Sequence, residues 1–256
     1  MSNKDKCLLG TKCGLAGSER CNSMCSAFIS LHGYSGKGGR VGSAELPKEY
    51  RLQLLANSPA KNEQEGIYDR LVKYVASFDR QFDEAETPKD RIKNLYLYSD
   101  ETGTGKTTTA SALANEWILK HFMLCARTKR KPDLNPAYFL DVNELQTLYN
   151  EFTRQGVPQD LGEQASREYY RRIGLARKAP FVVFDDIGVR TSTEGFRGDL
   201  HSLINYRVAE HKITVYTSNL PIESLMAHYD KRLWDRMRDL TIVMQFTGES
   251  KRGVRK

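Results

Sequence analysis

The sequence predicts an α/β fold built around a central parallel sheet. Short, almost continuously apolar segments alternate along residues 92–247 with longer segments whose apolar residues recur at helical spacing. Strands that are apolar throughout and separated by helices are typical of a parallel sheet covered on both faces. The chain has 256 residues, of which 39% are hydrophobic and 28% charged. This length is enough for a full core and a small accessory module.

The accessory module is expected at the N-terminus. Residues 1–44 hold four of the five cysteines and many of the 19 glycines. A segment this short and rich in glycine needs a staple, such as a metal, in order to fold. We therefore divide the chain into residues 1–44, a cysteine-rich module with its linker, and residues 45–256, the α/β domain.

The elements of the larger domain follow from the periodicity of apolar residues. A first helix at 65–82 is indicated by Ile67, Leu71, Tyr74, Val75 and Phe78. A helix at 107–122 is indicated by Ala110, Leu113, Ala114, Trp117 and Ile118. Later helices are expected at 143–152, 195–211 and 221–239. Strands are expected at 92–99, 137–141, 179–186, 213–219 and 241–247.

Residues 100–107 match most of a phosphate-binding loop. In the pattern G-x-x-x-x-G-K-[ST], backbone amides cradle phosphates, the lysine meets the β- and γ-phosphates, and the hydroxyl holds Mg²⁺. Asp100 replaces the first glycine, and we expect it to point outward because a carboxylate would repel phosphate. A chance GTGKT in a turn is the alternative, which the strand–loop–helix context disfavours. We predict ATP binding by Thr102, Gly103, Thr104, Gly105, Lys106, Thr107 and Thr108.

Two carboxylates end the strand at 179–186. Asp185 is predicted to hold Mg²⁺ together with Thr107, directly or through water. Asp186 is predicted to polarise the attacking water. Glutamate often fills this place and aspartate is shorter, so we expect hydrolysis to be slow or to need a partner. The alternative is a strand that simply ends in two solvated acids.

Two further segments carry candidate catalytic groups. The polar residues 217–219 end another strand and could contact the γ-phosphate or the water, although Ser-Asn also ends many strands as turn chemistry. Arg232 and Arg236 are four residues apart and share one helix face, whereas Arg238 points elsewhere. An arginine supplied across a subunit boundary can stabilise a transferring phosphoryl group. An ordinary basic helix face is the alternative.

Together these motifs resemble the bacterial replicative-helicase loaders of the DnaC/DnaI type, which are AAA+ ATPases of the IstB-like ATP-binding family. The resemblance spans residue 47 to the C-terminus and rests on the segments 46–51, 67–78, 102–116, 182–188, 213–220 and 232–238. It implies an AAA+ P-loop NTPase domain with little or no C-terminal lid. It also implies Asn219 as the sensor, Arg236 as the arginine finger and Arg232 as a nearby helper.

The clustered cysteines predict a metal site in the N-terminal module. Thiolates in a tetrahedral set suit Zn²⁺, and in a reducing cytosol they suggest metal before a disulfide. The proposed ligands are Cys7, Cys13, Cys21 and Cys25, with His32 as a substitute for one of them. Their loose spacing leaves an iron–sulfur cluster or a disordered cysteine-bearing tail as alternatives. The resemblance implies that this module grips the helicase.

The resemblance implies an ATP-dependent loader that binds the replicative hexameric DNA helicase and helps place it on single-stranded DNA during replication initiation. It also implies a homo-oligomer that assembles through the AAA+ domains. The basic segments 127–131 and 167–172 are candidate DNA contacts, or else solvated surface. An IstB-type transposition helper ATPase and an adaptor that binds nucleotide without hydrolysing it are the alternatives. The unusual loop suggests a phage or mobile-element origin.

Charge and hydropathy set the expected location. The net charge of +7 favours a polyanionic partner without proving one. No apolar run approaches the roughly 20 residues that cross a bilayer, and the N-terminus lacks the apolar part of a secretion signal. We therefore expect a cytoplasmic protein with no membrane partner, in the bacterial host if it is phage-encoded.

Overall fold

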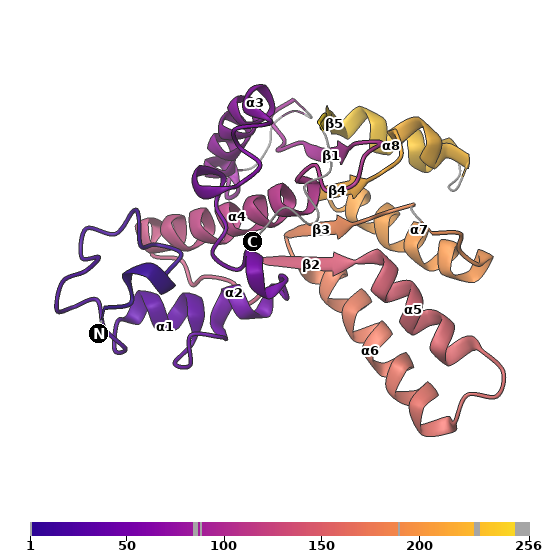
Figure 1. Cartoon of the computed structure of the whole chain (residues 1–256), viewed down its shortest axis with the longest axis horizontal. Helices are drawn as coiled ribbons and strands as arrows, with labels where there is room; N and C mark the ends of the chain where they lie inside the picture. The colour runs from indigo at the N-terminus through magenta and orange to yellow at the C-terminus, as the bar shows by residue number, and fades with distance from the viewer. Residues whose placement is uncertain (1, 84–86, 88, 189, 228–230, 249–256) are drawn as a thin grey trace.

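The computed structural model describes residues 2–83, 87, 89–188, 190–227 and 231–248. Within these residues five strands form one sheet in the order β2-β3-β4-β1-β5 (Figure 1). The strands are β1 (Asn94–Tyr98), β2 (Ala137–Asp141), β3 (Phe181–Asp185), β4 (Ile213–Ser218) and β5 (Thr241–Gln245). All of these strand pairings are parallel, which confirms the predicted α/β class. Their carboxyl ends therefore share one edge of the sheet, where α/β folds bind ligands.

Helices cover both faces of this sheet. The α-helices are α1 (Ser26–His32), α2 (Gly39–Ser43), α3 (Glu65–Ala76), α4 (Lys106–Thr128), α5 (Val142–Thr153), α6 (Gln159–Lys178), α7 (Glu194–Ala209) and α8 (Lys231–Leu240). The 3₁₀ helices are η1 (Lys4–Lys6), η2 (Lys48–Tyr50), η3 (Leu55–Asn57), η4 (Ser77–Arg80) and η5 (Ile222–Ala227). Alternate strand residues point to opposite faces. Leu97 and Val215 join the core that contains α3 and α4, and Tyr96 and Tyr216 join the core that contains α5, α6 and α7.

The pattern of apolar residues did not reveal α6. Its buried side chains are only Ala165, Tyr169 and Ala176, too few and too widely spaced to mark a helix face. The helix is stabilised by packing against α5, with which it forms an antiparallel hairpin that projects away from the sheet (Figure 1). Tertiary packing therefore creates an element that local periodicity could not predict.

Residues 2–44 pack against the α/β domain. Leu8, Leu9 and Leu31 belong to the same apolar core as α4. Arg40 donates hydrogen bonds to the carbonyl of Asp133 at 2.7 Å and that of Pro132 at 3.0 Å, in the segment that follows α4. These contacts attach the N-terminal residues to α4 and its neighbouring loop, while the domain division at residue 44 stays a prediction.

Two of the predicted helices are each divided in the structure. The segment 65–82 forms α3 followed by the 3₁₀ helix η4, and 221–239 forms η5 and α8 with residues 228–230 outside the described residues. After β5 the described chain, which stops at residue 248, contains no helix. Among the described helices none combines the length and the apolarity that a membrane span requires.

Candidate nucleotide-binding site

The loop between β1 and α4 has a backbone that only glycine adopts readily. Gly103 and Gly105 have φ angles of 73° and 96°, in the left-handed region that side chains disfavour. A Cβ on Gly105 would also lie 2.5 Å from the Cβ of Ala60. Asp100, at the position of the missing first glycine, is exposed, as expected for a carboxylate kept away from phosphate. The chain therefore makes its tight turn at Gly103 and Gly105 and leaves Asp100 in solvent.

Lys106 begins α4 with its side chain folded into the loop. It is only 6% exposed, and its Nζ donates to the carbonyl of Glu101 at 2.8 Å and to that of Ser99 at 3.4 Å. Thr104, two residues earlier, has a buried hydroxyl with no hydrogen-bond partner among the described residues. A buried ammonium and an unsatisfied buried hydroxyl within a glycine-shaped turn are what a phosphate-binding loop presents. The residues fit the phosphates of a nucleotide.

Asp185 lies at the carboxyl end of β3, beside the start of α4. Thr107 Oγ1 donates to its Oδ2 at 3.2 Å, and Thr217 Oγ1, from the neighbouring β4, donates to its Oδ1 at 2.6 Å. Thr107 and Thr217, which are 78 and 32 positions from Asp185 in the sequence, are thus joined to it across α4, β3 and β4. A threonine hydroxyl and a carboxylate in contact form an all-oxygen donor pair, which suits Mg²⁺. The predicted magnesium ligands Thr107 and Asp185 are therefore brought together.

Burial controls the charge of Asp185. The side chain is almost inaccessible, and burial raises its pKa to about 7, an effect reinforced by the nearby Asp186 and opposed by the hydrogen bond from Thr217. Without a cation the carboxylate therefore titrates near neutrality. A divalent cation held between Thr107 and Asp185 would favour the ionised form and reverse this shift.

Asp186 adopts an unusual backbone conformation immediately after β3. Its φ angle is 56°, in the left-handed region, where non-glycine residues are uncommon and often functional. Its backbone N–H donates to Thr217 Oγ1 at 2.9 Å. The same threonine hydroxyl thus contacts both predicted acids, fixing the turn that separates the Asp185 and Asp186 side chains.

Thr217 takes a role that the sequence prediction did not assign to it, although residues 217–219 were expected at the site. The resemblance favoured Asn219, but the described contacts to Asp185 at the end of β4 come from Thr217, one residue before the strand ends. Asn219 follows the strand in a partly exposed bend, and Ser218 is occupied by a hydrogen bond to the carbonyl of Ile187 at 2.7 Å. Only the register between β3 and β4 could have identified Thr217, and register is not visible in a single sequence.

The predicted arginine finger lies on α8, between η5 and β5. The side chains of Arg232 and Arg236 lie outside the described residues, so both roles stay predictions. Arg238, which was expected to point elsewhere, is exposed and contacts Asp235 at 3.7 Å and Asp239 at 3.2 Å.

The described residues do not support the predicted zinc site. Nowhere among them are three histidine, cysteine, aspartate or glutamate side chains arranged to hold a metal ion. The four N-terminal cysteines are free thiols, although Cys13, Cys21 and Cys25 lie near enough to Cys7 for their charges to add to the burial that raises its pKa.

His32, the predicted substitute zinc ligand, makes a structural contact. It is 2% exposed, and its Nε2 accepts a hydrogen bond from the Leu8 backbone N–H at 2.9 Å. Burial lowers the pKa of His32 to about 4, so the imidazole is neutral and its Nε2 lone pair is used within the protein. His32 therefore anchors the N-terminal segment to α1.

The two candidate DNA-binding segments differ in what they offer. In 167–172, Arg171 pairs with Glu45 at 2.7 Å, Arg172 pairs with Glu144 at 2.7 Å, and both contact Glu168. Tyr169 of the same segment is fully buried. Arg171, Arg172 and Tyr169 therefore stabilise the position of α6 through contacts within the protein. The segment 127–131, in contrast, is exposed throughout and keeps its basic character at the end of α4.

The comparisons with known proteins give structural matches only. No family model matches the sequence, and no curated protein matches it. The fold is similar to that of a protein named as a primosome component from Streptococcus pyogenes serotype M3, with a TM-score of 0.52 and 24% identity over 81% of this chain and 93% of that chain.

Two further structures match over similar lengths. DnaI matches with a TM-score of 0.52 and 21% identity over 81% of this chain and 94% of its own. The DnaC helicase loader matches with a TM-score of 0.53 and 16% identity over 78% of this chain and 100% of its own. This chain has the fold of DnaI and the DnaC helicase loader. The predicted resemblance is therefore confirmed for the fold, because identities this low show similarity of fold alone. These matches do not bear on the predicted phage origin.

Proposed function

We propose that this chain is an ATP-dependent loader that places a replicative DNA helicase on single-stranded DNA. The observation that carries the proposal is the contact network of Thr107, Asp185 and Thr217 beside the glycine-shaped loop. In an ATPase it would join the phosphate-binding and magnesium-binding halves of the site, and this chain has the fold of a helicase loader. The network supports nucleotide binding directly, and the fold similarity supports the choice of process.

Different residues of the chain would have different roles in ATP hydrolysis. Bound ATP and Mg²⁺ supply the phosphoanhydride bond and the charge that neutralises the phosphates. The amides of residues 102–108 and the ammonium of Lys106 bind the phosphate oxygens, while Thr107 and Asp185 hold the cation. Thr217 orients Asp185 through its 2.6 Å hydrogen bond and fixes the turn at Asp186.

The remaining groups would act at the γ-phosphate. Asp186 accepts a hydrogen bond from the attacking water and orients it, and Asn219 contacts the water or the γ-phosphate. Arg236, assisted by Arg232, reaches the site of a neighbouring subunit and stabilises the developing charge. Because the site is complete only between subunits, we propose a homo-oligomer whose geometry depends on bound nucleotide.

Residues 2–44 would contact the helicase. Leu15, Met24 and Tyr34 are large apolar side chains in this segment, exposed by 50%, 75% and 81%. Exposed aromatic and methionine side chains are enriched at protein interfaces, so these three residues are proposed as helicase contacts. The basic segment 127–131 would contribute to the contact with single-stranded DNA through the phosphates.

Measurement of ATP turnover by the full chain, with and without single-stranded DNA, tests the enzymatic part. We expect slow turnover that single-stranded DNA raises, and we expect Lys106→Ala and Asp185→Asn to abolish it. Lys120→Ala, on the same helix but paired with Asp79 at 2.8 Å, is the matched control and should behave as the wild type. Intact ATP binding with no turnover in either condition would instead establish a nucleotide-bound adaptor.

Capture of a replicative helicase by the immobilised full chain tests the partner. The double variant Met24→Ser/Tyr34→Ser should lose capture. Leu161→Ser/Tyr170→Ser, which removes exposed apolar side chains from α6, should retain it. Capture of a transposase and no helicase would contradict the loader assignment and favour the transposition helper.

A further inference from the structure

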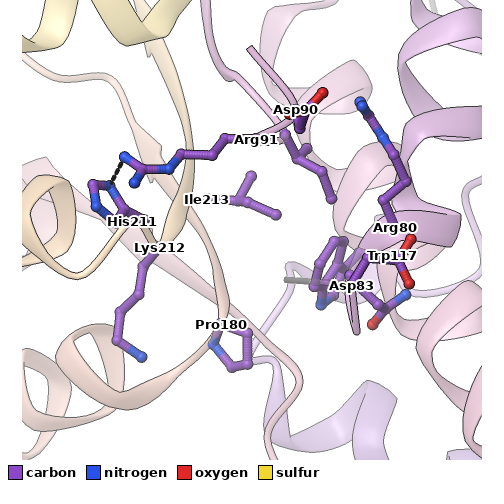
Figure 2. Close-up of a pocket in the computed structure, with 11 residues that line it drawn as sticks. Arg80, Asp83, Asp90, Arg91, Trp117, Pro180, His211, Lys212 and Ile213 are labelled. Atoms are coloured by element: carbon purple, nitrogen blue, oxygen red, sulfur yellow. Dashed lines mark hydrogen bonds between the residues drawn. The ribbon is translucent and has the colours of Figure 1, made fainter. Parts of the chain in front are cut away.

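A cavity of about 450 Å³ lies at the edge of the sheet opposite the nucleotide-binding site (Figure 2). Its walls come from η4 and the residues after it, α4, and the segments that lead into β1, β3 and β4. Strands begin at this edge, whereas the phosphate-binding loop and Asp185 follow strand ends. The volume lies within the range of sites that hold small organic groups, and none of the proposed ATPase residues lines it.

The floor of the cavity is apolar and rigid. It consists of Ile92, Trp117, Pro180 and Ile213, with Ile213 at the centre of the view in Figure 2. The Trp117 indole donates to the carbonyl of Pro136 at 2.9 Å and its ring stacks on Phe181, so it cannot turn away. An apolar group in this cavity would meet a preformed surface.

Basic side chains from three separate elements surround this floor. Arg80 comes from η4, Arg91 from the segment before β1, and Lys212 from the residue before β4. Arg91 Nη1 lies 2.9 Å from Nδ1 of His211, and Figure 2 shows this contact at one side of the cavity. Burial and the charge of Arg91 lower the pKa of His211, so the neutral ring accepts the hydrogen bond and holds the guanidinium at the rim.

A fourth cation lies directly behind the wall. Arg207 is 0% exposed, and its guanidinium donates to oxygens of residues that include Pro180 and Ile213, two members of the cavity lining. In the described part of the chain it contacts no carboxylate; the other acceptors are Ala176, Ala179 and Thr214. A buried charge in a low-dielectric wall projects its field into the cavity.

The balance of charge around the cavity is positive. Two carboxylates, Asp83 and Asp90, also line it. Asp90 is partly satisfied, because its Oδ2 accepts hydrogen bonds from the Thr87 backbone N–H at 3.0 Å and the Thr87 hydroxyl at 2.6 Å. The two acids would repel a continuous phosphate backbone. Figure 2 shows them across the cavity from the Arg91 guanidinium, so a single anionic group at Arg91 would lie away from both.

We propose that this cavity binds a carboxylate carried on an apolar body, with the apolar part on Ile213 and Trp117 and the carboxylate at Arg91. Lys212, whose Nζ donates to the carbonyl of Lys178 at 2.9 Å, adds positive charge beside it. The ligand is either a free organic acid or the C-terminal residue of a peptide, which share this chemistry. Charge-assisted hydrogen bonds to a guanidinium give the carboxylate its specificity, and burial of the apolar part supplies affinity.

Calorimetric titration of the full chain with matched probes tests the proposal. The probes are 2-naphthoate and its neutral twin 2-naphthamide, together with acetyl-Leu-Phe bearing a free carboxylate and the same dipeptide amidated. We expect at least one anion to bind about tenfold or more tightly than its neutral twin. Tighter binding of the dipeptide identifies a peptide terminus as the source, and tighter binding of naphthoate identifies a free acid.

Variants locate the binding in the cavity. Arg91→Met should lower the affinity for the anionic probe by about tenfold or more. Arg70 is an exposed arginine on α3, and Arg70→Met should leave this affinity unchanged. Lys212→Met is the second variant if Arg91→Met does not fold. Failure of both anions to bind at about 5 mM, equal binding of the neutral twins, or undiminished binding in the folded variants would overturn the proposal. The single-stranded DNA (dT)₁₅ is a further probe. If both variants lose (dT)₁₅ binding and neither anionic probe binds the wild type, the proposal is also overturned, and the cavity is instead a nucleic-acid contact.

Discussion

Asp185 shows how one buried carboxylate links stability to ligand binding. It is 5% exposed and held between the hydroxyls of Thr107 and Thr217. Its pKa of about 7 in the folded protein exceeds the ordinary value of 3.8. As pH rises between these values, the unfolded chain loses this proton while the folded chain keeps it. The folded state therefore loses stability across this window, and the full cost is present above about pH 7.

Asp185→Asn should accordingly stabilise the ligand-free protein. Removal of the ionisable group relieves a cost on the order of 2–4 kcal/mol at pH 8, and we expect the gain to shrink to less than half at pH 5. Urea unfolding at the two pH values measures this. Added MgATP should raise the midpoint of the wild type more than that of the variant. A variant less stable than the wild type at pH 8 would contradict the burial argument.

Gly105 shows how backbone geometry shapes the phosphate-binding loop. Gly105→Ala must adopt a φ of 96° and place a methyl group 2.5 Å from Ala60. We expect a loss of about 1–3 kcal/mol in stability and weaker ATP binding, read by thermal unfolding and titration. Gly174→Ala, in the middle of α6 with open space around it, is the control. It should be neutral or stabilise by up to about 1 kcal/mol.

Sequence reasoning at this scale works where the signal is local. Lys106 and Thr107 could be proposed because a phosphate-binding loop is contiguous, and Asp185 because it ends an apolar strand; the structure places Thr107 and Asp185 in contact. The hydrogen bond from Thr217 to Asp185 could not be predicted, because it depends on strand register. Arg207 was not singled out, since its complete burial results from packing between distant segments.

At the scale of elements, α6 depends on contacts that the sequence does not display. The carbonyls of Ala176, in its last turn, and Ala179, just after it, accept hydrogen bonds from Arg207 Nη1 at 2.6 Å and 2.9 Å. Arg207 also binds the Ile213 carbonyl at 2.6 Å, so one side chain from α7 connects the end of α6 to the start of β4. The same lack of local signal explains why α6 was not predicted and why helix 221–239 was predicted as one piece.

Arg207→Met should therefore destabilise the protein strongly. The substitution removes several hydrogen bonds and leaves buried carbonyls unsatisfied, at a cost of about 2–5 kcal/mol. The unfolding midpoint in urea measures the loss. Arg177→Met is the matched control, because within the described part of the chain that guanidinium lies only over the Tyr206 ring, at 3.9 Å, and it should cost under about 1 kcal/mol. Equal effects of the two substitutions would show that burial of Arg207 contributes little.

At the scale of the whole molecule, two edges of one sheet carry different chemistry. The carboxyl edge holds the loop, Asp185 and Thr217, whereas the amino edge holds the cationic cavity of Figure 2. The alternation of strands and helices made the sheet and its first edge predictable, since parallel strands place their ends together. The cavity was not predictable, because its residues come from separate segments. Leu8, Leu9 and Leu31 share one apolar core with residues of α4, which links the proposed helicase-binding segment to the helix that begins at Lys106.

Titration of the full chain with MgATP is the most direct test of the central claim that Lys106, Thr107 and Asp185 form one nucleotide-binding site. We predict that the wild type and Lys120→Ala bind equally, and that Lys106→Ala and Asp185→Asn each weaken binding by about tenfold or more. Unchanged affinity in a folded Lys106→Ala variant would contradict the account.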